Sequence, residues 1–205
     1  AFLVMLERTL TQFMKGVFQV DILRRPRLDL AIKLGAAFLV FQAWLPSALA
    51  VALLAILVAL LMYRFSCWRP DLGFRRLELA VMYLGYLAIV AQLLFEMLAL
   101  MGIGHWTGSL PMHVFTFGAM GLIIPAMLVR ISLGHTGRKV AFDTGDRLVI
   151  RIMLLAFVVR IVLPQLFPGA YAHWIHLAAG AWTFAFAVLG FRLIPRLLAP
   201  RVDGR

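Results

Sequence analysis

The sequence predicts an all-α membrane protein, a polytopic bundle of about six transmembrane helices. Of its 205 residues, 63% are hydrophobic and only 14% are charged, whereas a soluble domain carries about 45–50% apolar and about 25% charged residues. The apolar residues form long stretches, and the basic residues lie in alternate gaps between them. A soluble fold of this length cannot bury so much apolar surface, so lipid is the predicted solvent.

The predicted helices cover about 30–45, 47–63, 77–101, 111–131, 147–166 and 171–194. The first is shorter than the ~20 residues that a bilayer core requires, so Lys33 must snorkel or the helix must begin nearer Leu28. We expect residues 1–29 to be the end of a preceding helix and a basic cytoplasmic loop, and 30–205 to be the bundle with a cytoplasmic tail. Residues 1–6 are apolar but lack the charged start of a signal peptide, so we expect a longer membrane protein.

The distribution of charge predicts the orientation in the membrane. Every Lys and Arg except Arg160 falls within 8–33, 64–76, 130–151 or 192–205, whereas 44–46, 102–111 and 164–171 carry no charged side chain. Cytoplasmic loops are enriched in Lys and Arg, so both ends of the chain should be cytoplasmic. The net charge of +11 then reflects topology and contact with anionic lipid. Nucleic-acid binding is not expected, because it would need these residues gathered on one soluble face.

Two charged side chains lie within predicted helices, Glu96 and Arg160. At ~1.5 Å per residue, both lie roughly 7–9 Å below the predicted outer surface. A charge at that depth costs ~2.5 kcal/mol or more unless it faces a partner or water. We therefore expect the two to pair with each other, either as a clasp that fixes helix packing or as part of a functional site.

Histidines gather on the same predicted side. His113 begins the fourth helix, His173 and His176 begin the sixth, and His105 lies in the outer loop; only His135 is cytoplasmic. Imidazole ligates haem iron and copper within helix bundles, which makes His113 and His176 candidate ligands. Taken singly, each histidine is better explained by an interfacial hydrogen-bonding role, and it is the cluster that favours a ligand site. Cys67 is the only cysteine, so neither a disulfide within the chain nor a cysteine metal cluster can form.

The segment 130–138, RISLGHTGR, is the clearest local motif. Gly134 is expected to end the fourth helix in a left-handed cap, with Arg130 complementing the helix dipole. Two glycines then frame His135 and Thr136. The alternative interpretation is a plain helix stop with a basic tail, and no phosphate loop or serine nucleophile is present. The motif residues of uncertain role are Arg130, Ser132, Gly134, His135, Thr136, Gly137 and Arg138.

These residues carry a resemblance to a known family. The runs 112–121 (MHVFTFGAMG) and 130–138, then Pro195 and 200–205 (PRVDGR), resemble the NnrS family of bacterial membrane proteins, as do 7–10 (ERTL) and 24–29 (RRPRLD). Full-length members have about twelve helices, so the resemblance implies that this chain is the C-terminal half. The family's histidine-rich N-terminal segment is absent.

The resemblance implies a haem- and copper-containing protein of the inner membrane that helps denitrifying and pathogenic bacteria withstand nitric oxide. It implies a process rather than a reaction, so no enzymatic activity is assigned. His113 and His176 are then the expected cofactor ligands, and Glu96 with Arg160 the expected propionate contacts or charge relay. The expected partners are the bilayer, the N-terminal half and nitric oxide. Two alternatives stay open: a transporter, or a structural half that supports a cofactor held elsewhere.

Overall fold

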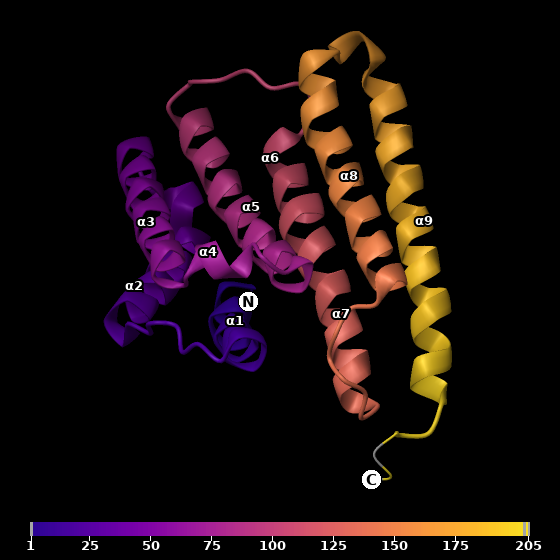
Figure 1. Cartoon of the computed structure of the whole chain (residues 1–205). Coiled ribbons are helices and arrows are strands. Elements are labelled where there is room, and N and C mark those ends of the chain that lie inside the picture. The colour runs from indigo at the N-terminus through magenta and orange to yellow at the C-terminus, as the bar shows by residue number, and fades with distance from the viewer. Residues whose placement is uncertain (1, 203, 205) are drawn as a thin grey trace. The chain divides into compact units, whose positions relative to one another are not determined.

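The computed structural model describes residues 2–202 and 204, and within them the backbone is helical with no strand (Figure 1). The chain divides into two compact units, Ala1–His105 and Trp106–Arg205. Five helical segments are long and apolar enough to cross a membrane: Ser47–Cys67, Leu77–Leu100, Leu110–His135, Thr144–Leu166 and Pro168–Leu198. The predicted all-α membrane bundle is confirmed, and five of its six predicted spans correspond to these segments.

The remaining predicted span, 30–45, is helical but differently built. Helix α2 (Pro26–Phe38) continues without a break into a 3₁₀ helix, η1 (Leu39–Trp44). At ~1.5 Å per α residue and ~2.0 Å per 3₁₀ residue, this path is about 31 Å long, close to the ~30 Å of a bilayer core. The helix therefore begins before Leu28, and the 3₁₀ stretch lengthens a segment that would be too short as an α-helix alone.

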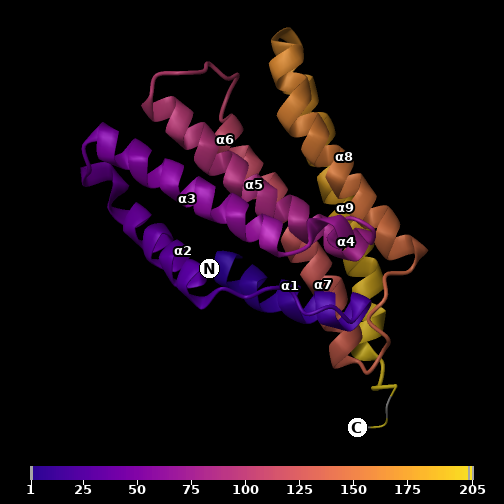
Figure 2. The same ribbon diagram turned by 60° about the vertical axis from the view of Figure 1, so that its left-hand side comes forward.

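In the first unit, α1 (Phe2–Phe18) buries Leu6, Leu10 and Met14, which are spaced four residues apart along one face. Helix α1 packs on α5 (Leu77–Leu100). Helix α3 (Ser47–Cys67) packs on both α2 and α5. Figure 2 shows α2 and α3 side by side. The short α4 (Pro70–Gly73) joins α3 to α5. Helix α1 is amphipathic and runs to Phe18, so it makes up more than half of residues 1–29, which were expected to be the end of a preceding helix and a basic loop.

In the second unit, α8 (Thr144–Leu166) and α9 (Tyr171–Leu198) form an antiparallel pair joined by η3 (Pro168–Ala170) (Figure 1). A third continuous segment consists of α6 (Leu110–His113), the π-helix η2 (Val114–Met120) and α7 (Gly121–His135), and it packs on α8 and α9. At Gly121 a Cβ would lie 3.2 Å from both the Thr116 carbonyl oxygen and the Trp182 Nε1. Glycine therefore lets the π-helix join α7 while Trp182 lies against it.

Candidate functional site

The buried arginine of α8 pairs with a histidine. Arg160 is 5% exposed, and its Nη2 lies 2.9 Å from Nε2 of His113. The two residues are 47 positions apart in the sequence, and their side chains meet because α6 packs on α8. Both residues were candidates from the sequence, but their direct contact was not foreseen.

The hydrogen bonds of His113 determine which ring nitrogen carries the proton. Its Nδ1 lies 2.8 Å from the Ser109 carbonyl oxygen, which can only accept, and 3.1 Å from the Ser109 hydroxyl. Nδ1 is therefore the protonated nitrogen, and Nε2 accepts from the Arg160 guanidinium. A ring nitrogen held by a backbone carbonyl is the arrangement in which metal-ligating histidines are usually oriented.

Aromatic side chains surround this pair. The Arg160 guanidinium lies 5.8 Å from the Tyr171 ring centre, and the His113 ring lies 6.0 Å from that of Phe117. Phe117 in turn contacts Trp182, at 5.4 Å between ring centres. The Trp182 Nε1 is buried without a hydrogen-bond partner. The pair thus lies beside the aromatic side chains of Phe117 and Trp182, and the Trp182 N–H is an unsatisfied donor.

The second predicted charge, Glu96, lies in the other unit. Its Oε1 accepts a hydrogen bond of 3.1 Å from the Gln42 amide on η1, and it lines a cavity of about 490 Å³ with Ser47 and Leu100. Glu96 and Arg160 therefore each have a partner within their own unit. Their expected pairing with each other stays a prediction.

The other histidines show no such anchoring. His105, His173 and His176 are exposed, the last two on α9. Among the described residues, no three His, Cys, Asp or Glu side chains lie close enough together to hold a metal ion. The assignment of His113 and His176 to a shared cofactor stays a prediction.

The 130–138 motif is a helix end, and its cap was predicted at the wrong glycine. Helix α7 continues through Gly134 to His135, and Gly137 adopts the left-handed conformation with φ of +72°. The Arg138 N–H donates to the Leu133 carbonyl and the Gly137 N–H to that of Gly134, which is a Schellman motif. The correction follows from these two bonds, which a left-handed residue at position 134 could not form.

Polar residues of this motif are used in structure. The Ser132 hydroxyl donates to the Val129 carbonyl, and the Thr136 hydroxyl to that of Ser132. The Thr136 carbonyl accepts from the Val202 N–H of the tail, and Arg138 donates to the Arg196 carbonyl. His135 is exposed. The segment thus fixes the end of α7 to the end of α9 and the tail.

Beside it lies an ion-pair cluster. Asp143 caps α8 in a capping box with Asp146, and both carboxylates accept hydrogen bonds from Arg192 and Arg196 of α9. Partial burial raises the pKa of Asp143, but the Asp146 N–H and the charges of the two arginines outweigh it and leave that pKa below its ordinary value. The cluster joins the start of α8 to the end of α9.

A second buried cluster escaped the sequence analysis. Arg64 of α3 is 1% exposed; its Nη1 lies 3.4 Å from the Asp29 carboxylate and 3.9 Å from that of Glu7. Its Nε donates to the Tyr86 hydroxyl, and its guanidinium stacks 4.7 Å from the Trp68 ring centre. The sequence offered one signal for this cluster. The chain has 9 acidic residues against 20 Lys and Arg, so an acidic residue such as Asp29 or Glu7 is expected to pair with a basic one.

Lys33 belongs to the same cluster. Its ammonium lies 2.8 Å from Glu7 Oε2, so it pairs with α1. The sequence left two alternatives, a snorkelling Lys33 or an earlier helix start. The helix does start earlier, at Pro26, and the Lys33 ammonium is paired with Glu7. The amphipathic α1 therefore contributes a charge as well as an apolar face to the first unit.

Comparison with known proteins identifies the family. No curated protein and no solved structure matches the chain. The sequence model of one family, described as NnrS protein, matches residues 1–201. The match includes the His113–Arg160 pair, both ion-pair clusters and all five helical segments long enough to span a membrane. The chain therefore belongs to the NnrS family, membrane proteins of the nitric oxide response.

Proposed function

We propose that this chain is part of an inner-membrane protein that handles nitric oxide, or protects against its products, through a haem or copper centre to which His113 contributes a ligand. The observation that supports this most is the orientation of His113, whose Nδ1–H is held by Ser109 while Nε2 presents its lone pair to Arg160. Neutral imidazole with one nitrogen anchored is the form that ligates metals.

The residues present fit one ligand and its surroundings rather than a whole site. His113 would ligate haem iron or copper through its imidazole, and the unsatisfied Trp182 N–H would donate to a polar group of a ligand nearby. His176 is exposed and remains the second candidate ligand. When bound, such a metal supplies a coordination position for nitric oxide. The remaining ligands would come from the N-terminal half of the protein.

Arg160 has a separate role in this proposal. As long as its guanidinium donates to His113, the Nε2 lone pair is occupied. A carboxylate that forms a bidentate pair with the guanidinium would draw Arg160 away and release that nitrogen. A haem propionate has this chemistry, and Glu96 is the carboxylate in this chain at the matching predicted depth. Arg160 would thus hold a carboxylate and control access to His113.

The test is cofactor content in the purified full-length protein. We expect His113→Ala to lose most of the Soret absorbance or the copper, and His176→Ala to lower it, whereas His135→Ala should retain it because His135 lies in the cytoplasmic helix end. Optical spectra and metal analysis measure both. Unchanged content in the two outer variants would place every ligand in the N-terminal half and leave this chain a supporting role. Loss in His135→Ala alone would move the site to the other face.

A transporter is the second candidate, and one observation favours it. The segment Leu110–His135 is interrupted by the π-helix Val114–Met120 and contains Pro125, and interrupted helices beside buried charges line the substrate paths of many transporters. Flux of a substrate into proteoliposomes by protein free of haem and copper would support this function and contradict the first.

The proposed orientation has its own test. After Arg205, a reporter that works only in the cytoplasm should be active. After Gly104, a reporter that works only in the periplasm should be active, since the charged residues of alternate loops fall on one side. Gly104 lies in an exposed loop, so the insertion should be tolerated. The opposite pattern at either position would overturn the assignment of both chain ends to the cytoplasm.

A further inference from the structure

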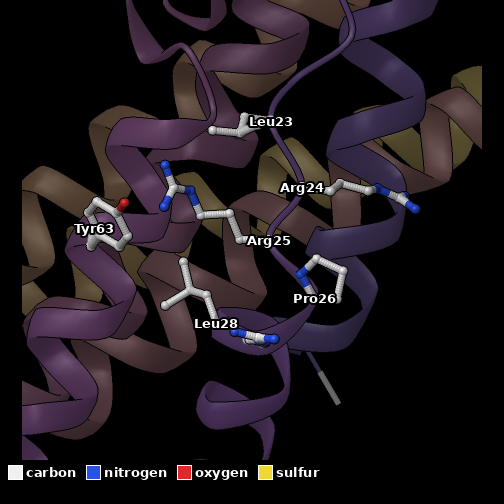
Figure 3. A pocket seen from close by; sticks show the side chains of 7 residues that line it. Leu23, Arg24, Arg25, Pro26, Leu28 and Tyr63 are labelled. Carbon is white, nitrogen blue, oxygen red and sulfur yellow. The ribbon is translucent and has the colours of Figure 1, made fainter.

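A basic pocket lies where α2 begins and α3 ends. It has a volume of about 600 Å³ and is lined by Arg24, Arg25, Arg27, Leu23, Leu28 and Tyr63 (Figure 3). Arg25 stacks its guanidinium 5.2 Å from the Tyr63 ring centre, and Figure 3 shows Leu28 beneath the two. Cationic and apolar groups thus line the same hollow.

The charge of this pocket is not neutralised by the nearby carboxylates. Asp29 is buried against Arg64, and Asp21 pairs with Lys15 at 3.1 Å. Arg24 donates to the Thr11 hydroxyl, a neutral group. No carboxylate of the described residues lies within ion-pair distance of Arg25 or Arg27. The pocket therefore carries uncompensated positive charge that an anion from outside the chain could neutralise.

Exposed apolar residues continue from the pocket along both helices. On α2, Leu30, Leu34 and Phe38 are each more than half exposed and four residues apart, so they share one face. On α3, Ile56 lies two turns from Tyr63 and is also more than half exposed. From Arg27 to Phe38 the helix rises about 16 Å, which is the depth of one leaflet of a ~30 Å hydrocarbon core.

We propose that this pocket binds the phosphodiester headgroup of an anionic phospholipid, whose acyl chains lie along the exposed faces of α2 and α3. Arginine pairs with phosphate through two parallel N–H donors, and basic pockets between helices at the cytoplasmic surface recognise anionic headgroups. A free phosphate ion would make no use of Leu23, Leu28 or the apolar faces. A lipid satisfies both the charges and the apolar surface that leads away from them.

The test compares two charge-matched double variants of the full-length protein in detergent. Native mass spectrometry with added phosphatidylglycerol would count the bound lipid. Arg25→Gln with Arg27→Gln should weaken binding by about tenfold or more, since each basic contact near the surface contributes on the order of 1 kcal/mol. Arg75→Gln with Arg76→Gln removes the same charge from exposed residues outside the pocket and should leave binding unchanged. Arg25→Lys with Arg27→Lys keeps the charge and should bind with intermediate affinity.

Three results would overturn the proposal. Equal losses in the two Gln double variants would show a general surface attraction with no site. Equal binding of phosphatidylcholine would show that the headgroup charge is not recognised. Displacement of the lipid by inorganic phosphate at equal concentration would show a site for free anions. If the Gln double variant does not fold, unchanged lipid binding in the Lys variant together with phosphate displacement would also contradict it.

Discussion

Replacing Arg64 by leucine should destabilise the first unit by about 4 kcal/mol. The substitution removes the cation that lies between the Asp29 and Glu7 carboxylates. Breaking a buried pair from one side costs about 3–5 kcal/mol, because the remaining charge stays in a low-dielectric environment. The Tyr86 hydroxyl loses its donor and the Trp68 ring its cation in the same variant. Unfolding of the detergent-solubilised protein by a denaturing detergent measures the loss.

The matched control is Arg69→Leu, in the loop that follows α3. Arg69 forms an exposed ion pair with Asp71, so its removal should leave the unfolding curve unchanged. The double variant Arg64→Leu with Asp29→Leu should recover part of the loss, since the unpaired Asp29 carboxylate is then gone and Glu7 still has Lys33 as its partner. An Arg64→Leu protein as stable as the Arg69→Leu protein would show that the cluster does not stabilise the unit.

Replacing Asp146 by asparagine should cost about 3 kcal/mol, at the lower end of the range for buried pairs. The Asp146 carboxylate is 1% exposed, and Arg192 and Arg196 donate to it at 3.1–3.2 Å. Its loss leaves two cations on α9 with only the half-exposed Asp143. Asp143→Asn should have a much smaller effect, because asparagine also caps a helix and the position is open to solvent. Thermal unfolding of the two variants measures the difference.

The same cluster predicts how stability depends on pH. The pKa of Asp143 is lower in the folded chain than its ordinary value of 3.8. A carboxylate of this kind contributes stability that is fully present above its unfolded pKa and is lost as the pH falls through the folded pKa. Melting temperature should therefore fall more steeply below about pH 4 in the parent protein than in Asp143→Asn. Parallel curves would show that Asp143 does not contribute to the pH dependence.

The sequence predicted the transmembrane helices well because hydrophobicity determines them directly. It identified Arg160 and His113 as candidates but not their pairing, since that contact depends on how α6 packs against α8. It missed the burial of Arg64 because a basic residue at a helix end usually faces water. The cap glycine was assigned to Gly134 rather than Gly137 because both glycines suit a helix end, and only the backbone hydrogen bonds distinguish them.

The π-helix between His113 and Gly121 sets the rotational phase of its segment. Each residue of an α-helix turns the chain by about 100°, whereas each residue of a π-helix turns it by less, so winding Val114–Met120 as a regular α-helix of equal length would rotate His113 relative to Pro125. The imidazole would then point to a different neighbour, although every side chain in the pair was still present. The π-helix therefore determines which neighbour the imidazole meets, and proteins that wind this segment as a regular α-helix of the same length would lose the arginine–histidine contact.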